Sequence, residues 1–233
     1  MAGTRLRMLN LGCGSVPRPS DETWEVINHD LVALPNVDAV WDLNDYPWPW
    51  SDESFECVQA FDLLEHLDDP IKPLEEIHRI LKMKKPNGDP GMAVIKVPMA
   101  GSLNHQIDPT HHRGYTEYSF DFFDPETAFG KQESHYSWAR FWVWRIRHDP
   151  EFARDDRPID LAESPVVGED RKLPDWIAER IRNRGRGVNL CFELAKLPAD
   201  EQVRAMYAKA GAPRPRHRYM VGLNPPVRRQ DGG

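Results

Sequence analysis

Carboxylates and glycines follow the first three apolar segments of the chain, at a spacing that is typical of nucleotide binding. Residues 10–14 contain a tight turn with two glycines, which allow a ligand to approach the backbone closely. Asp30 lies 18 residues beyond Gly12, close to the roughly 20 residues that separate such a turn from a ribose-binding carboxylate. Asp42 and Leu43 follow the third segment and suit the exocyclic amine and the ring face of a purine.

Histidines gather where the fourth and fifth predicted strands end. His66 follows the fourth strand, and Asp108, His111 and His112 follow the fifth. In an open parallel sheet ligands bind beyond these strand ends, so we predict that the four residues form a catalytic group that orients an acceptor or takes its proton. The structural alternative is a polar loop, braced by Asp108 and Arg113, that ties the start of a helix to its neighbour.

No metal site is predicted from the sequence. A site that adds His105 to the nearby histidines is the weaker hypothesis, because the spacings match no familiar ligand pattern. The three cysteines, Cys13, Cys57 and Cys191, are an odd number without metal-like spacing, and they do not indicate a disulfide framework.

The elements that must position these residues alternate between strands and helices, which favours an α/β fold with a mainly parallel sheet. The predicted strands span residues 6–11, 24–28, 37–41, 55–61 and 92–97. Between the last two lies the clearest helix, which Asp69 can cap and Pro70 can begin, with an apolar stripe from Ile71 to Leu81. We expect helices on both faces of this sheet.

The second half of the chain is less regular. It contains predicted helices at residues 116–123, 175–184 and 199–210, and two long late strands at 136–147 and 187–197 that extend the sheet, with an antiparallel late strand. The sequence therefore predicts one domain over residues 1–211, with a polar insertion near 149–173. Residues 212–233 form a tail rich in proline and arginine.

The charge is unevenly distributed, which bears on nucleic-acid binding. Residues 1–135 carry 11 Lys and Arg against 23 Asp and Glu, whereas residues 180–229 carry 12 against 3. Such a basic end can bind a polyanion, but it is more often a solvated surface. Trp138, Trp142 and Trp144 alternate along one late strand and could stack on bases, although a buried strand face is the favoured interpretation.

Taken in order, these motifs resemble those of the class I S-adenosylmethionine-dependent methyltransferases, and most closely the broad type 11 methyltransferase-domain group. The resemblance rests on segments at residues 9–14, 28–31, 42–43, 49–56, 64–66, 76–82 and 94–98, and residues 108–113 are similar to a segment of bacterial and phage members. It covers about residues 5–125 and the two late strands. It implies a Rossmann-like fold and an enzyme that uses S-adenosyl-L-methionine, but it does not indicate the substrate.

The resemblance also implies which residues contact the cofactor. They are Leu11, Gly12, Cys13 and Gly14 on the methionine and ribose side, Asp30 and Leu31 at the ribose, Asp42 and Leu43 at the adenine, and Ala60 and Phe61 at the methionyl group. Two positions depart from the family pattern. Asn10 replaces an acid before the turn, and Val16 replaces a third glycine, while Pro17 and Pro19 disfavour a helix there.

Composition sets the remaining expectations. Hydrophobic residues make up 40% of the chain, enough for a core, and no apolar run approaches the roughly 20 residues of a membrane span. We expect a cytoplasmic enzyme, without a membrane partner, that methylates an oxygen or nitrogen of a small or glycosyl-type acceptor. One alternative is a nucleic-acid or modified-nucleotide methyltransferase, and another is a non-catalytic module that binds the cofactor. The sequence does not assign an oligomeric state.

Overall fold

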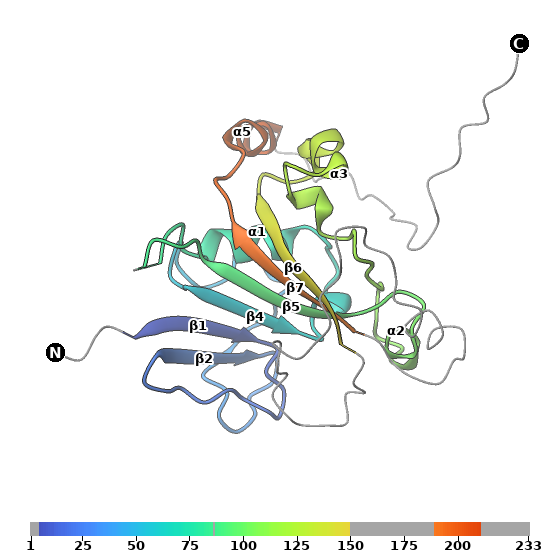
Figure 1. The fold of residues 1–233 in the computed structure, drawn as a ribbon. Coiled ribbons are helices and arrows are strands. Elements are labelled where there is room, and N and C mark those ends of the chain that lie inside the picture. The colour runs from blue at the N-terminus through green and yellow to red at the C-terminus, as the bar shows by residue number, and fades with distance from the viewer. Residues whose placement is uncertain (1–4, 86, 150–188, 211–233) are drawn as a thin grey trace, which may run out of the picture.

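A computed structural model shows one seven-stranded sheet whose strands are mostly parallel (Figure 1). The structure describes residues 5–85, 87–149 and 189–210. The strands are β1 (Leu6–Leu11), β2 (Trp24–Asp30), β3 (Ala39–Val40), β4 (Cys57–Phe61), β5 (Met92–Pro98), β6 (Phe141–Asp149) and β7 (Asn189–Lys196). Their order is β3-β2-β1-β4-β5-β7-β6, and β7 is antiparallel to both of its neighbours. The predicted mainly parallel sheet with an antiparallel late strand is therefore confirmed.

Short helices connect the strands. They are the 3-10 helices η1 (Leu64–His66), η2 (Asp121–Phe123) and η3 (Ser134–Tyr136), and the α-helices α1 (Lys72–Ile80), α2 (Leu103–Ile107), α3 (Ala128–Gln132) and α5 (Glu201–Ala210). Asp69 accepts the backbone N–H groups of Ile71 and Lys72, but α1 begins at Lys72 with Ile71 as its N-cap, so the predicted start at Asp69 and Pro70 is too early. The apolar stripe of α1 is buried in the same core as the central strands, and Figure 1 shows α1 behind the sheet. None of the helices in the described residues is long and apolar enough to cross a membrane.

Some helices of the second half of the chain differ from those predicted. The helix expected at residues 116–123 is wrong beyond η2, because the Ser119 hydroxyl accepts the Thr116 N–H and holds the segment as a turn. The helices α2 and α3 are capped by Ser102 and Thr127 and were not predicted. The insertion near 149–173, the helix at 175–184 and the tail at 212–233 lie outside the described residues.

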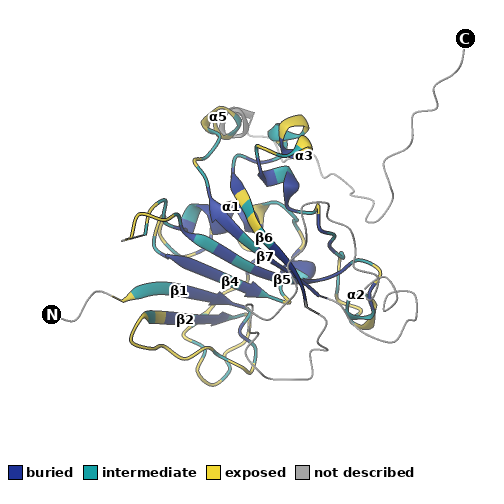
Figure 2. Cartoon of the chain, viewed as in Figure 1, coloured by how far each residue is buried: buried dark blue, intermediate teal, exposed yellow. Residues whose placement is uncertain are grey.

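The expected buried tryptophan face is also wrong. Trp142 and Trp144 are 48% and 50% exposed, and Figure 2 shows exposed positions along β6. Side chains alternate along β6, and Trp142 and Trp144 lie on its solvent-facing side, whereas Phe141 on the other side is buried. Trp138, by contrast, precedes β6 and packs against the core.

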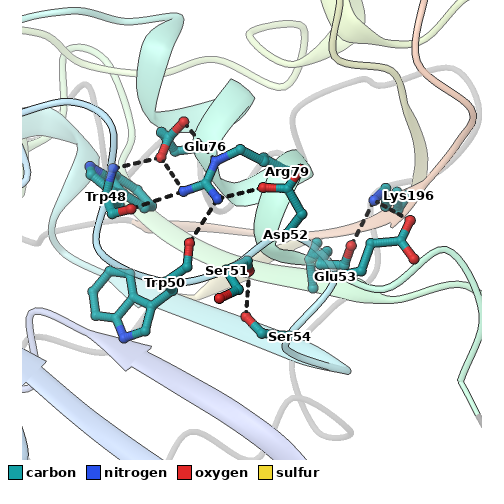
Figure 3. Close-up of polar contacts among 10 residues, drawn as sticks. Trp48, Trp50, Ser51, Asp52, Glu53, Ser54, Glu76, Arg79 and Lys196 are labelled. Atoms are coloured by element: carbon teal, nitrogen blue, oxygen red, sulfur yellow. Dashed lines mark hydrogen bonds and ion pairs between the residues drawn. The ribbon is translucent and has the colours of Figure 1, made fainter.

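The loop between β3 and β4 is fastened to α1 through one arginine (Figure 3). Arg79 donates hydrogen bonds to the carbonyl oxygens of Trp48 at 3.1 Å and Trp50 at 2.7 Å. It also pairs with Glu76 at 2.6 Å and Asp52 at 2.8 Å. A planar guanidinium suits this arrangement because it presents several donors in fixed directions. The network therefore fixes the loop that leads into β4.

Candidate functional site

The turn after β1 is shaped for close approach of a ligand. Gly12 and Gly14 have φ angles of 64° and 55°, a left-handed region that favours glycine. A Cβ atom added to Gly14 would meet nothing within 4 Å, so open space adjoins this part of the backbone. The N–H of Gly14 donates to Asp30 Oδ2 at 2.8 Å, which ties the turn to the end of β2.

Asp30 and Asp42 fit the cofactor contacts that the sequence predicts. Asp30 accepts one N–H from Gly14 and one from Val32, at 2.8 and 3.0 Å. An ionised carboxylate offers about four lone-pair positions, so it keeps the capacity to accept two ribose hydroxyls. Asp42 is exposed beyond β3, and one of its oxygens accepts the N–H of Asn44 at 2.9 Å. Both carboxylates therefore suit the ribose and adenine of S-adenosylmethionine.

The other predicted cofactor residues differ in how accessible they are. Leu31 is 62% exposed, whereas Leu43 is only 4% exposed and belongs to the core. The remaining apolar positions on this side are mostly buried at the ends of β1 and β4: Leu11, Cys13 and Ala60 are buried and Phe61 is half-buried. Burial, followed by the nearby Asp30 charge, raises the pKa of the Cys13 thiol. Their contact with the cofactor stays a prediction.

Asn10 is bound within the sheet. Its side-chain N–H donates to Asn28 Oδ1 at 3.0 Å, and its Oδ1 accepts from Gln59 Nε2 at 3.1 Å. These three residues occupy adjacent register positions on β2, β1 and β4. The amide that replaces the family's acid is therefore satisfied by its neighbours. Residues 15–23 contain no helix, as Pro17 and Pro19 predict.

His66 lies on η1, and the residue that precedes η1, Leu63, packs against the turn after β1. A Cβ atom on Gly12 would come within 3.1 Å of Leu63, the residue that precedes η1. The Nδ1 atom of His66 is 2.9 Å from the Thr110 hydroxyl, which in turn donates to Asp108 Oδ1 at 2.6 Å. Because that hydroxyl gives its proton to Asp108, it accepts from His66 Nδ1–H. The Nε2 atom of His66 therefore carries the lone pair.

Two of the groups around His66 have shifted pKa values with clear causes. Burial, and then the proximity of His111, lowers the pKa of His66. Hydrogen bonds from the side chain and backbone of Thr110 lower the pKa of Asp108. Both shifts favour a neutral imidazole held in place by an ionised carboxylate.

His111 faces His66 from the loop after β5. Their ring centroids are 4.7 Å apart in an edge-to-face arrangement. His111 Nδ1 donates to the carbonyl oxygen of His105 at 3.1 Å, so its Nε2 atom also carries a lone pair. That Nε2 atom lies 3.9 Å from Glu65 Oε1.

Glu65 is a site residue that the sequence analysis did not single out. Its side chain is fully buried, and neither of its carboxylate oxygens has a hydrogen-bond partner among the described residues. Burial raises the pKa of Glu65 to about 8. Its position next to His66 was visible in the sequence, but no local pattern indicated that it is buried. Thr110 was also missed, although it lies between two predicted residues.

His112 turns away from this cluster. Its Nδ1 atom lies 3.5 Å from Asp68 Oδ1 near the surface, while its backbone N–H donates to the carbonyl of Glu65 at 2.8 Å. Arg113 reinforces the same join between η1 and the loop by donating to three backbone carbonyls, those of Leu64, Leu67 and Asp68. The structure thus brings His66, His111 and Asp108 together and leaves His112 at their margin.

Comparison with known proteins gives one family match. Residues 23–88 match the model of a family described as a methyltransferase domain. Among solved structures, the chain is similar to a SAM-dependent methyltransferase from Archaeoglobus fulgidus, with 18% identity over 84% of this chain and 87% of that chain and a TM-score of 0.47. A SAM-dependent methyltransferase from Methanosarcina mazei gives 12% identity over 83% and 93%, also with a TM-score of 0.47. No curated protein matches the chain in sequence.

Proposed function

We propose that this chain is a class I S-adenosylmethionine-dependent methyltransferase that acts on an oxygen or nitrogen atom of a small or glycosyl-type acceptor. The methyltransferase-domain match over residues 23–88 and the ordered strand-end motifs on a mainly parallel sheet support the enzyme class. The proposal for the acceptor is carried by one observation, the pair of imidazoles of His66 and His111 beyond the ends of the parallel strands β4 and β5.

The residues that hold the cofactor contribute to the reaction mainly by aligning it with the acceptor. When bound, S-adenosylmethionine supplies a methyl group that is already activated on its sulfonium. Proximity and orientation can supply an effective molarity of about 10⁵–10⁸ M, whereas a general base typically adds about 10²–10⁴-fold. Asp30 would hold the ribose hydroxyls and Asp42 would hold the adenine amine, which fixes the cofactor along the ends of β1, β2 and β3.

On the side where the methyl acceptor would bind, His66 can act as a proton acceptor. Thr110 and Asp108 hold His66 in the tautomer whose Nε2 atom carries a lone pair. That atom can orient an O–H or N–H group, or take its proton as the new bond to the methyl group forms. Acceptors with a removable proton on oxygen or nitrogen therefore fit this site best.

A small acceptor is favoured over a nucleic acid by charge. The candidate site lies wholly within residues 1–135, which carry 11 basic against 23 acidic side chains. A phosphate backbone would be repelled near such a surface. The arginine-rich segments that could attract nucleic acid, at residues 180–186 and 211–233, lie outside the described residues.

Two measurements test the proposal. Calorimetry with S-adenosylhomocysteine should show one site per chain, and methyl-labelled cofactor should then label the small-molecule fraction of a cell extract divided into nucleic acid, protein and small molecules. Label in the nucleic-acid fraction would support the nucleic-acid alternative instead. Binding of S-adenosylhomocysteine without label in any fraction would support the non-catalytic module.

A further inference from the structure

We propose that Glu65, His66 and His111 form a binding site for a divalent transition-metal ion, with Zn²⁺ as the fitting example. One ligand-type atom from each residue lies within 4.8 Å of the other two. Two imidazoles and one carboxylate are a ligand set that zinc and related ions accept. This inference goes beyond the proposed methyl transfer, because ion binding can be measured without any acceptor.

The two imidazoles are held in the tautomers that a metal requires. His66 donates its Nδ1–H toward Thr110, and His111 donates its Nδ1–H to the carbonyl of His105. Each ring therefore keeps a lone pair on Nε2, and that of His111 lies 3.9 Å from Glu65 Oε1. Metal-binding histidines characteristically donate their other N–H to a carbonyl, a carboxylate or a similar acceptor, which fixes the ring orientation. Both histidines already have such a partner.

The burial of Glu65 is independent evidence for a bound cation. It is fully buried beside the imidazoles, with both carboxylate oxygens unpartnered among the described residues. A buried polar group without a hydrogen bond is costly, so native structures seldom retain one without a ligand or partner. Its Oε1 atom lies 3.9 Å from His111 Nε2, which is too far for a hydrogen bond. Lone pairs of the three residues thus converge without a hydrogen bond to either oxygen of Glu65, and a cation that displaces the proton of this buried carboxyl would satisfy them together.

The ligand atoms of the three residues would move only modestly closer together to bind a zinc ion. Zinc binds nitrogen and oxygen at about 2.0–2.2 Å, which places the ligand atoms of a tetrahedral site roughly 3.3 Å apart. Glu65 and His111 are already at 3.9 Å, and His66 is half-buried at the open side of the cluster. Three protein ligands leave a fourth position free, as in catalytic zinc sites. An ion held there could bind the acceptor's oxygen or nitrogen, and His66 would then serve as a ligand in place of a proton acceptor.

The test uses the full chain without an affinity tag, stripped with a chelator and then titrated with Zn²⁺ against a chromogenic competitor. We expect one equivalent to bind, and Co²⁺ to give the intense visible spectrum of a low-coordinate site. Glu65→Gln, which preserves side-chain size, and His111→Ala should each weaken Zn²⁺ binding at least about a hundredfold, since loss of an outer partner alone costs about 10–100-fold. Thr110→Val should cost about tenfold, and Thr110→Ser should restore binding.

The matched control is His112→Ala, which removes the adjacent imidazole that faces Asp68. It should leave Zn²⁺ affinity unchanged. Circular dichroism and affinity for S-adenosylhomocysteine verify that each variant is folded, and Glu65→Gln alone decides the matter if His111→Ala does not fold. The proposal is overturned if the wild-type chain binds no stoichiometric Zn²⁺, or if folded Glu65→Gln binds as well as wild type. Neither result bears on the transfer of labelled methyl groups, so failure of the metal site is distinguishable from failure of the proposed function.

Discussion

The two halves of the ligand-binding edge are built in different ways. At the ends of β1, β2 and β3, carboxylates near the surface accept backbone N–H groups. Asp30 and Asp42 each accept the N–H of the residue two positions further along the chain, and Asp30 also accepts the N–H of Gly14 in the turn after β1. At the ends of β4 and β5, side chains from distant segments contact one another, and one of them, Glu65, is buried without a hydrogen-bond partner among the described residues. The first half is suited to holding a ligand of constant shape, and the second is suited to chemistry. Substitutions should therefore separate cofactor affinity from turnover.

The largest expected effect is on turnover at the acceptor side. His66→Ala removes the Nε2 lone pair beyond the end of β4 and should lower kcat about a hundredfold or more, within the usual range for loss of a general base. The affinity for S-adenosylhomocysteine should change little, because the proposed ribose and adenine contacts, Asp30 and Asp42, follow other strands. The assay is transfer of labelled methyl groups to the acceptor fraction at saturating cofactor.

The control for this prediction is His135→Ala, which changes an exposed imidazole on η3, far along the chain from the cluster. Its turnover should equal that of the wild type. If His66→Ala instead loses cofactor affinity while kcat is preserved, the division between the two halves of the edge is incorrect.

The next effect is on cofactor affinity. Asp30→Ala should weaken S-adenosylhomocysteine binding at least tenfold, because a hydrogen bond to a charged acceptor contributes about 1.5–3 kcal/mol and two hydroxyls share this carboxylate. Asp30→Asn keeps one acceptor oxygen, so its affinity for S-adenosylhomocysteine should lie between those of the wild type and Asp30→Ala. Calorimetry measures the affinities and circular dichroism checks the fold. Wild-type affinity in a folded Asp30→Ala variant would contradict the placement of the ribose.

His78 on α1 provides a contrast with Glu65, because it is buried but has a hydrogen-bond partner. His78 Nε2 donates to the carbonyl of Leu197 at 2.8 Å, and its ring lies edge-on to Trp138 and Phe141. Burial lowers the pKa of His78 to about 4, with smaller contributions in the same direction from Lys196 and Arg204. The unfolded chain then binds a proton below about pH 6.5 that the folded chain binds only near pH 4.

The stability of the protein should therefore fall as the pH drops from about 6.5 to about 4, by up to about 1.4 kcal/mol per pH unit from this group. His78→Gln can still donate to the Leu197 carbonyl but cannot titrate. Urea unfolding at several pH values should show a smaller loss of stability in this variant than in the wild type. Identical pH dependence in both would show that His78 is not the group responsible.

The smallest expected effect concerns nucleic acid. Arg180, Arg182, Arg184 and Arg186 fall at every second position, so a helix would spread them over several faces and form no single basic stripe. We expect at most weak, non-specific binding that collapses between about 50 and 200 mM salt, because each neutralised phosphate adds to the salt dependence. Fluorescence anisotropy with a labelled duplex measures this. Tight binding at 200 mM salt that is lost when the tail arginines are changed would favour the nucleic-acid alternative.

The local features of the fold were predictable from the sequence. The strand at Leu6–Leu11 has the predicted bounds, and β4 and β5 end within one residue of the predicted positions. The helix that follows Asp69, although it begins later than predicted, follows from its apolar spacing, and the absence of a helix at residues 15–23 follows from Pro17 and Pro19. These features depend on contacts within a few residues, so the sequence contains the information that specifies them.

Only the tertiary structure decided which polar side chains meet. Residues 65 and 111 are far apart in the chain, and they converge because β4 and β5 are parallel neighbours whose ends share one edge. The same loop presents His111 to Glu65 and turns His112 toward Asp68, a choice that spacing alone does not encode. Likewise, only the packing of the sheet left the side of β6 that carries Trp142 and Trp144 exposed to solvent. The sequence determined the elements and the polarity of their ends, whereas burial and convergence depended on how those elements pack.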